Sequence, residues 1–312
     1  MEKVHWLPER LWKERAGLTQ KRLDSQMKAF LDGKFIEKKE RLITLENRGL
    51  TFGDGLFEVL RVKDGHIFFF EDHLVRMKSS AVFFGIPFPY SLDEIKDRAR
   101  ELIAFNGIDD GELYVELTRG IDQNREHKYP SENTQPTFFM LAIPLREIDP
   151  SNWERGAVVF GFPDLRHKLC EHKTINLLPN VMAKNFAYKR GGYEALMYRE
   201  DSKGRYATEG GSSNYFLVKN HTVITPEIDI ILPGITRSKV VKLLKENGVE
   251  VVERRVYYDE FLKADEVFLV STVSMVMPVR KIDNKQLAAP GKITLKAMEL
   301  YRKLIDEEKG RC

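Results

Sequence analysis

The 312-residue chain has few cysteines, little net charge and no long apolar run, and each scarcity argues against a class of protein. Two cysteines, Cys170 and Cys312, are too few for a disulfide framework, which favours a reducing, cytoplasmic location. The longest apolar stretch, residues 267–279, is too short and too polar to span a bilayer, and the first residues lack the apolar core of a secretory signal. The 50 basic and 47 acidic residues are interleaved, so we expect neither a nucleic-acid nor a membrane partner.

The residues that are present suit a globular protein with a real core. Hydrophobic residues make up 42% of the chain and charged residues 31%, and the length fits one large domain or two medium ones. In the first half, Asp32-Gly33 and Asp64-Gly65 between β-rich segments predict hairpins. Helical spacing and capping residues predict the helices 71–84 and 91–106, and further strands are expected over 57–62, 66–70, 112–119 and 137–145.

In the second half, helices and strands are again expected to follow one another along the chain, and strands outnumber helices. Pro179 suits the first turn of a helix that Gly191-Gly192 would end, and Gly248 would end another. The expected helices are one beginning near Pro179, then 236–247, 258–264 and one from Thr294. The expected strands are 157–161, 193–199, 214–218, 222–225, 250–256, 267–270 and 277–282.

A polar, proline-containing stretch at 146–153 is the best candidate for a linker between domains. The first 28 residues are charged and only weakly helical, and the sequence does not indicate their purpose. The sequence therefore predicts a two-domain α+β protein with an N-terminal arm at 1–28, a small domain at 29–147 and a large domain at 148–312.

Lys173 stands where a strand gives way to a helix, a junction at which side chains commonly face a cleft. A lysine that forms a Schiff base must lose its proton, so it needs cationic or desolvating neighbours. From the spacing alone, an ordinary solvated lysine is the better interpretation.

Glu209 lies in the small-residue stretch Thr208-Glu-Gly-Gly-Ser-Ser-Asn214, where backbone or ligand can approach closely. A carboxylate beside the ring nitrogen of a pyridine cofactor would keep that nitrogen protonated. The competing interpretation is a β-bulge with a surface glutamate.

A phosphate site is predicted at Pro233-Gly-Ile-Thr-Arg237, a glycine turn that opens a helix. Free backbone N–H groups at a helix start, here those of Ile235 and Thr236, bind phosphate together with the helix dipole. The hydroxyls of Ser271 and Thr272 and the guanidinium of Arg76 could add hydrogen bonds. An ordinary capped helix is the alternative.

Taken together, the motifs resemble the fold-type IV (class IV) pyridoxal-phosphate aminotransferases, and among them the D-amino-acid aminotransferases. The resemblance runs in family order from about residue 29 to residue 305. The matching stretches are Asn47-Arg-Gly-Leu-Thr-Phe-Gly-Asp-Gly-Leu-Phe-Glu58, Glu71-Asp-His-Leu-Val-Arg76, Lys173-Thr-Ile-Asn-Leu-Leu178, Thr208-Glu-Gly-Gly-Ser-Ser-Asn214, Pro233-Gly-Ile-Thr-Arg237 and Ala264-Asp-Glu-Val-Phe268.

The resemblance implies the two-domain α+β architecture of that family, with pyridoxal 5'-phosphate as cofactor, no metal, and the large domain as its binding unit. Lys173 would form the internal aldimine and move the substrate α-proton, and Glu209 would pair with the pyridine nitrogen. The remaining cofactor contacts would come from Arg76, Ser212, Ser213, Asn214, Ile235, Thr236, Ser271 and Thr272.

The loop Arg125-Glu-His-Lys-Tyr-Pro130 is similar to the one that, in D-amino-acid aminotransferases, reaches across a dimer to hold the substrate carboxylate. In an extended loop Arg125 and His127 would point the same way, and both can donate to a carboxylate.

Phe57 departs from the subfamily, which has a tyrosine there. A lost hydrogen bond to a charged group is worth about 1.5–3 kcal/mol, so substrate choice could differ. Cys170 has a family counterpart and is interpreted as a packing residue.

The resemblance therefore implies a homodimer, with the active site at the subunit interface, that transaminates D-alanine or a related D-amino acid with a 2-oxo acid such as 2-oxoglutarate. Three alternatives stay open. They are a branched-chain L-amino-acid aminotransferase, an aminodeoxychorismate-lyase-like enzyme of the same fold, and a binding protein that retains only the fold.

Overall fold

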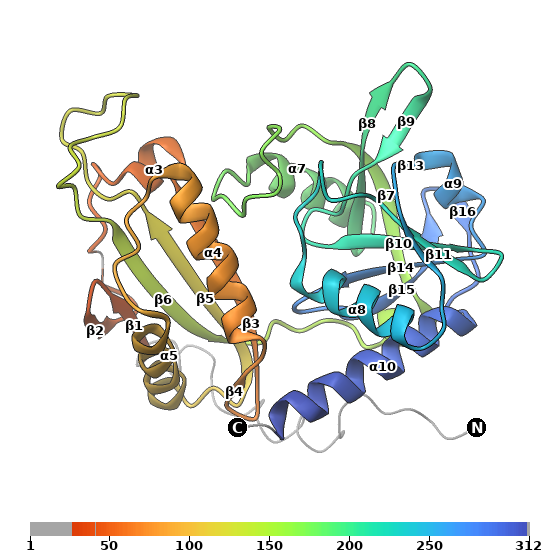
Figure 1. Cartoon of the computed structure of the whole chain (residues 1–312), viewed down its shortest axis with the longest axis horizontal. Helices are drawn as coiled ribbons and strands as arrows, with labels where there is room; N and C mark the ends of the chain where they lie inside the picture. Colours follow the sequence, from red (N-terminus) through yellow and green to blue (C-terminus); the bar gives the residue numbers. More distant parts are fainter. Residues whose placement is uncertain (1–26, 41, 311–312) are drawn as a thin grey trace.

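A computed structural model describes residues 27–40 and 42–310, which form two α+β halves, each built on one sheet (Figure 1). Most of the arm predicted at 1–28 lies outside the described residues. The predicted division at 147/148 falls in the connection between the two sheets, and as a domain boundary it stays a prediction. None of the helices among the described residues has the length and apolar character needed to cross a membrane, and the cytoplasmic location likewise stays a prediction.

The first half is an antiparallel sheet of six strands in the order β2-β1-β6-β5-β3-β4. Two long helices cover one face of it, and a short helix, α3, precedes β3. The elements are β1 (Lys28–Leu31), β2 (Lys34–Glu37), α3 (Arg48–Phe52), β3 (Gly55–Lys63), β4 (His66–Ile67), α4 (Phe70–Phe84), α5 (Leu92–Asn106), β5 (Asp110–Thr118) and β6 (Thr137–Pro144).

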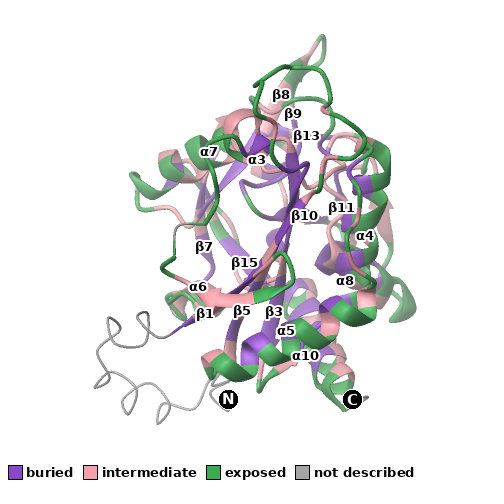
Figure 2. Cartoon of the chain, turned by 90° about the vertical axis from the view of Figure 1, so that its left-hand side faces the viewer, coloured by how far each residue is buried: buried purple, intermediate pink, exposed green. Residues whose placement is uncertain are grey.

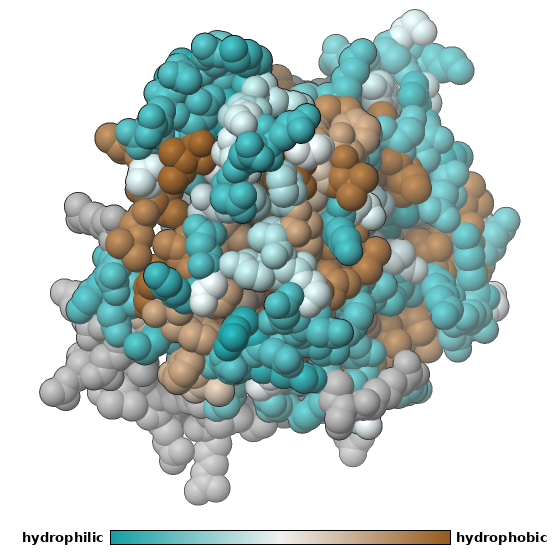
Figure 3. Space-filling view, turned by 60° about the vertical axis from the view of Figure 1, so that its left-hand side comes forward, coloured by the Kyte–Doolittle hydropathy of each residue, from teal (hydrophilic) through white to brown (hydrophobic). Residues whose placement is uncertain are grey.

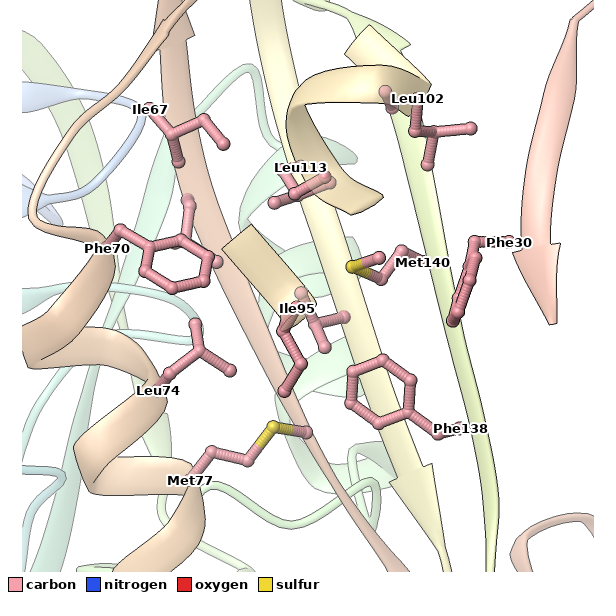
Figure 4. Packing of buried hydrophobic residues seen from close by; sticks show 14 of the residues in the cluster. Phe30, Ile67, Phe70, Leu74, Met77, Ile95, Leu102, Leu113, Phe138 and Met140 are labelled. Carbon is pink, nitrogen blue, oxygen red and sulfur yellow. The ribbon is translucent and has the colours of Figure 1, made fainter. Parts of the chain in front are cut away.

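The two long helices form where the sequence predicts them. Ser91 caps α5 in a reciprocal capping box with Glu94, and Gly85 ends α4 in the left-handed conformation (φ 61°). Figure 4 shows how their apolar stripes meet the sheet, with Leu74, Met77 and Ile95 directed toward residues such as Leu113 and Phe138. This core fixes α4, and with it the polar face of α4 that turns to the second half.

The second half is a mixed sheet of ten strands in the order β12-β11-β10-β14-β15-β7-β8-β9-β13, with β16 paired to β15. Its central strands are buried while the outer faces of the surrounding helices are exposed (Figure 2). The strands are β7 (Ala157–Pro163), β8 (Glu194–Asp201), β9 (Gly204–Ala207), β10 (Asn214–Lys219), β11 (Thr222–Thr225), β12 (Val251–Glu253), β13 (Val256–Tyr257), β14 (Glu266–Ser271), β15 (Met275–Ile282) and β16 (Lys285–Gln286). The helices are α6 (Ser151–Arg155), α7 (Leu178–Tyr188), α8 (Ile235–Glu246), α9 (Tyr258–Leu262) and α10 (Lys292–Lys309).

Two predicted strands differ from the observed ones. The strand expected over 66–70 stops at Ile67, because Phe69 adopts a left-handed conformation (φ 52°) and Phe70 begins α4. The strand expected over 250–256 is two strands, since β12 pairs in parallel with β11 whereas β13 pairs with β9. The short elements α3, α6, β9 and β16 are not predicted from the sequence, since none has a hydrophobic period long enough to read.

Candidate active site

A cavity of about 900 Å³ lies between the two halves and is lined by side chains from both. From the first half come Phe57 of β3 and Arg76 of α4, and most of the remaining wall comes from the second half. Of the predicted site residues, the structure brings the following to this cavity: Phe57, Arg76, Lys173, Glu209, Ser212, Ser213, Asn214, Ile235, Thr236, Ser271 and Thr272.

Lys173 is positioned by backbone pairing with β3. Its carbonyl accepts the N–H of Phe57 at 3.0 Å, and its neighbour Thr174 forms a bridge with Leu56. The Nζ atom therefore stands over the Phe57 ring, 4.1 Å from the centroid. Burial lowers the pKa of Lys173 to about 8, against the attraction of nearby carboxylates, so a substantial fraction of the amine is neutral near physiological pH.

Glu209 is buried in a tight turn that also lines the cavity. The turn is closed by the Gly210 N–H, which donates to the Ser213 carbonyl at 2.6 Å. The Glu209 carboxylate accepts from Asn214 Nδ2 at 2.9 Å and from the Leu232 N–H at 3.1 Å. Burial raises the pKa of Glu209, although a nearby guanidinium opposes the rise. The interpretation as a surface glutamate is therefore wrong.

That guanidinium belongs to Arg166, a residue that the sequence analysis does not single out. Arg166 Nη1 donates to Glu209, while its Nε and Nη2 donate to the two carboxylate oxygens of Asp164 at 2.9 and 2.8 Å. The available signal is the spacing Asp164-Leu-Arg166 immediately after β7. Arg166 thus helps to hold the Glu209 carboxylate in place.

Arg76 is held by Glu58, a second residue to which the sequence analysis assigns no role. Its Nε and Nη2 donate to the two Glu58 oxygens at 2.7 Å each, and its Nη1 donates to the Pro233 carbonyl of the second half at 2.9 Å. Glu58 is fully buried and also contacts His73 Nδ1 at 2.7 Å. Burial works against ionisation of Glu58, but Arg76 and His73 outweigh it and lower its pKa to about 2. A glutamate inside the apolar run Leu56–Leu60 is the signal that could have revealed it.

The start of α8 also lines the cavity. Its N-cap, Gly234, provides no side-chain cap, so the first N–H groups of the helix, at Ile235 and Thr236, have no partner from a capping side chain. A side chain at Gly234 would collide with Oδ1 of Asn214, which explains the glycine. Uncapped amides beside the Arg76 guanidinium are well suited to a phosphate group.

Arg125 and His127 lie apart from the cavity, in the loop between β5 and β6 at the upper left of Figure 1. The loop is not simply extended, because Arg125 has a left-handed backbone (φ 47°). Both side chains nevertheless contact Phe52, with the Arg125 Cζ atom 5.0 Å and the His127 ring centroid 5.2 Å from the centroid of its ring. Within one chain, neither reaches the cavity.

The groups around the cavity fit a phosphorylated pyridine aldehyde. They provide a lysine with a lowered pKa for the aldehyde, a buried carboxylate for a ring nitrogen, and uncapped helix amides with an arginine for a phosphate. Each of the three reactive or charged parts of such a molecule therefore has a matching group in one cavity.

Comparisons with known proteins agree with this chemistry. The family model "Amino-transferase class IV" matches residues 55–282. The D-alanine aminotransferase of Bacillus licheniformis is 38% identical over 272 residues, covering 86% of this chain and 93% of that protein. The solved branched-chain aminotransferase of the archaeon Thermoproteus uzoniensis, in complex with norvaline, superposes with a TM-score of 0.79 at 27% identity, covering 91% of this chain and 96% of that one.

A 4-amino-4-deoxychorismate lyase from Pseudomonas aeruginosa shares the same fold, with a TM-score of 0.75 at 27% identity, covering 88% of this chain and 98% of that one. The fold therefore carries more than one activity, while the family match extends over most of both halves of the chain. The predicted family and its two-domain α+β fold are confirmed, and the chain is an aminotransferase of the class IV family.

Proposed function

We propose that this aminotransferase uses pyridoxal 5'-phosphate to move the amino group of D-alanine, or of a related D-amino acid, to a 2-oxo acid such as 2-oxoglutarate. The observation that carries the proposal is the convergence of Lys173, Glu209 and the uncapped start of α8 on one cavity. The name of the Bacillus licheniformis relative supplies the substrate class.

When bound, the cofactor supplies an electron-withdrawing ring that stabilises negative charge at the substrate Cα. Arg76, Ile235, Thr236 and Thr272 would bind its phosphate, and Glu209 would accept a hydrogen bond from its ring nitrogen. Glu209 can do so because Arg166 and Asn214 already fix the orientation of its carboxylate. Further cofactor contacts would come from four other polar residues of the wall, Ser212, Ser213, Asn214 and Ser271.

Lys173 would hold the cofactor covalently and, once released by substrate, would take the proton from the substrate Cα. Its lowered pKa favours this role, because a protonated lysine can neither attack an aldehyde nor accept a proton. The backbone bonds to β3 hold Nζ over the Phe57 ring, so the base is already positioned before substrate enters.

The substrate carboxylate would be held by Arg125 and His127 of a second copy in a homodimer, since these residues lie outside the cavity of their own chain. Exposed apolar side chains beside that loop, among them Leu50, Ile121 and Tyr129, favour an association there. Apolar patches are visible between hydrophilic ones on the face shown in Figure 3. Phe57 would contribute a ring in place of the hydroxyl expected at the carboxylate.

A branched-chain L-amino-acid aminotransferase is the second candidate, supported by the fold shared with the Thermoproteus uzoniensis enzyme and by the apolar Phe57. A lyase of the kind found in Pseudomonas aeruginosa is the third, and its support is the shared fold.

The test is a donor screen on the purified holoprotein. The protein should be yellow and should bleach on addition of D-alanine, much less on addition of L-alanine or L-leucine. Borohydride should fix the cofactor on the peptide that contains Lys173, and Lys173→Ala should abolish both the labelling and the turnover. Bleaching by L-leucine alone would replace the proposal with the second candidate, and a label on any other peptide would refute the role of Lys173.

A further inference from the structure

The cavity extends beyond the space that the cofactor contacts require. From Phe57, which lies under Lys173 Nζ, it continues along the same face of β3 to Val59, about 7 Å further along the strand. The lining also includes Glu112 of β5 and Arg146, which lies with the lining acids Glu147 and Asp149 in the connection between the two halves. Glu112 pairs in register with Arg61, so it stands one step past Val59 on the neighbouring strand. A substrate side chain directed away from Lys173 along this wall would meet the charges of Glu112 and Arg146.

The cations that line the cavity are Arg76, Arg146, Arg166, Lys173 and Lys184. Four of them have assigned partners or chemistry: Arg76 is bound to Glu58, Arg166 to Asp164 and Glu209, Lys184 to Glu194 at 3.0 Å, and Lys173 to the proposed cofactor. Arg146 is exposed, and no described residue forms a hydrogen bond or ion pair with its side chain. It is therefore the lining cation that a substrate group could engage.

Glu112 is the counterpart of Arg146 in the lining of the cavity. It is half-buried, its carboxylate forms no hydrogen bond with any described residue, and burial raises its pKa while Arg146 and its cross-strand neighbour Arg61 lower it. Arg146 acts on Tyr193 as well, whose hydroxyl is fixed at 2.6 Å from Ser274 Oγ. Glu112, Tyr193 and Arg146 all line the cavity, and no hydrogen bond or ion pair joins Glu112 to Arg146.

We propose that Arg146 binds the distal carboxylate of a dicarboxylic 2-oxo acid or amino acid, and that Glu112 limits how tightly that carboxylate is held. The inference rests on the proposed function and specifies the substrate class of the same site. A distal carboxylate that loses water needs a cationic hydrogen-bond donor, and a guanidinium offers a forked contact. Glu112 repels the same carboxylate. When no substrate is bound, Glu112 attracts the Arg146 guanidinium.

The test compares kcat/KM for 2-oxoglutarate with kcat/KM for pyruvate, which is the matched acceptor without the distal carboxylate. In Arg146→Ala the ratio of the two should fall about tenfold, and in Arg146→Lys, which keeps the charge but not the fork, it should fall less. In Glu112→Gln the ratio should rise. The control is Arg155→Ala, an exposed arginine at the end of α6 that does not line the cavity, and its ratio should equal that of the parent.

An Arg146→Ala enzyme that uses both acceptors with the parental ratio, or a Glu112→Gln enzyme whose ratio falls, would overturn the inference and leave the proposed function intact. A parent protein that binds pyridoxal 5'-phosphate but transaminates neither acceptor would refute the proposed function itself, and the inference with it. Measuring the acceptor half-reaction alone separates these results from any change in donor binding.

Discussion

The reactivity of individual side chains in the cavity depends on their burial and on the charged groups around them. Lys173 lies over the Phe57 ring, near the Arg76 guanidinium and within the field of Glu58 and Glu209. Burial disfavours its charged form and the two carboxylates favour it, and burial prevails. The lysine is consequently a nucleophile at a pH where most lysines are protonated.

This predicts how the reaction of the cofactor-free protein with pyridoxal 5'-phosphate depends on pH. The rate of labelling at Lys173 should rise with pH and reach half of its limit at about pH 8. In the urea-denatured chain the same peptide should reach half of its limit at about pH 10.4, the usual lysine value. Rates are followed by borohydride quenching and peptide mapping. The same midpoint in the folded and denatured chains would contradict the account.

At this scale, the sequence reveals residues that stand in motifs and misses those that act through another residue. Lys173 and Glu209 lie in stretches whose glycines and helix starts carry a signal of their own. Arg166 lies outside such stretches, and Glu58 only ends one. Their role is to orient Glu209 and Arg76, and nothing in a single sequence pairs residues that are distant along the chain.

Among the elements, α3 and the loop between β5 and β6 behave as one unit because of Arg48. This buried arginine donates to Asp54 at 2.9 Å, to Asp122 at 3.2 Å and to the Glu126 carbonyl at 2.7 Å. Its guanidinium also lies 4.7 Å from the centroid of Phe52, the ring that both Arg125 and His127 contact. Arg48 therefore fixes the conformation of the loop that carries the proposed carboxylate clamp.

We expect Arg48→Ala to raise the KM for the amino donor about tenfold, because the loop loses hydrogen bonds that hold the clamp. Cofactor retention should stay at the parental level, since Arg48 does not line the cavity. The comparison is with Arg98→Ala, an exposed arginine of α5 paired to Glu101 on the surface. Loss of cofactor together with donor affinity, in a variant that still folds by circular dichroism, would show that Arg48 has no selective role in the loop.

Helices and strands can be predicted from the sequence where they have a long hydrophobic period or strong capping residues. The helices α4, α5, α8 and α10 are predicted to within two residues of their observed starts. The five-residue α3 is too short to show a hydrophobic period, and the position of β9 depends on a partner far along the chain. Ala207 and Tyr206 of β9, for example, pair with β13 about fifty residues later.

For the whole molecule, the location of Arg125 and His127 outside their own cavity has a consequence for mixed dimers. Each active site would combine the Lys173 of one chain with the loop of the other. Two different defective chains should therefore restore full donor affinity when they are combined.

Co-expression of Lys173→Ala chains with Arg125→Ala chains should yield heterodimers with one complete site and one doubly defective site. Their KM for the donor should equal that of the parent, at about half of its kcat per dimer, whereas the Arg125→Ala homodimer should keep a raised KM. Differently tagged chains allow the heterodimer to be isolated for kinetics. A heterodimer with the raised KM would mean that the loop serves its own chain.

The bond from Arg76 Nη1 to the Pro233 carbonyl joins α4 of the first half to the segment just before α8 in the second. The same guanidinium stands beside the proposed phosphate site, so closure of the molecule and loading of the cofactor share one group. By linkage, whatever favours one must favour the other. A chain loaded with vitamin B6 should therefore keep its halves together more firmly, and forcing them apart should release the vitamin.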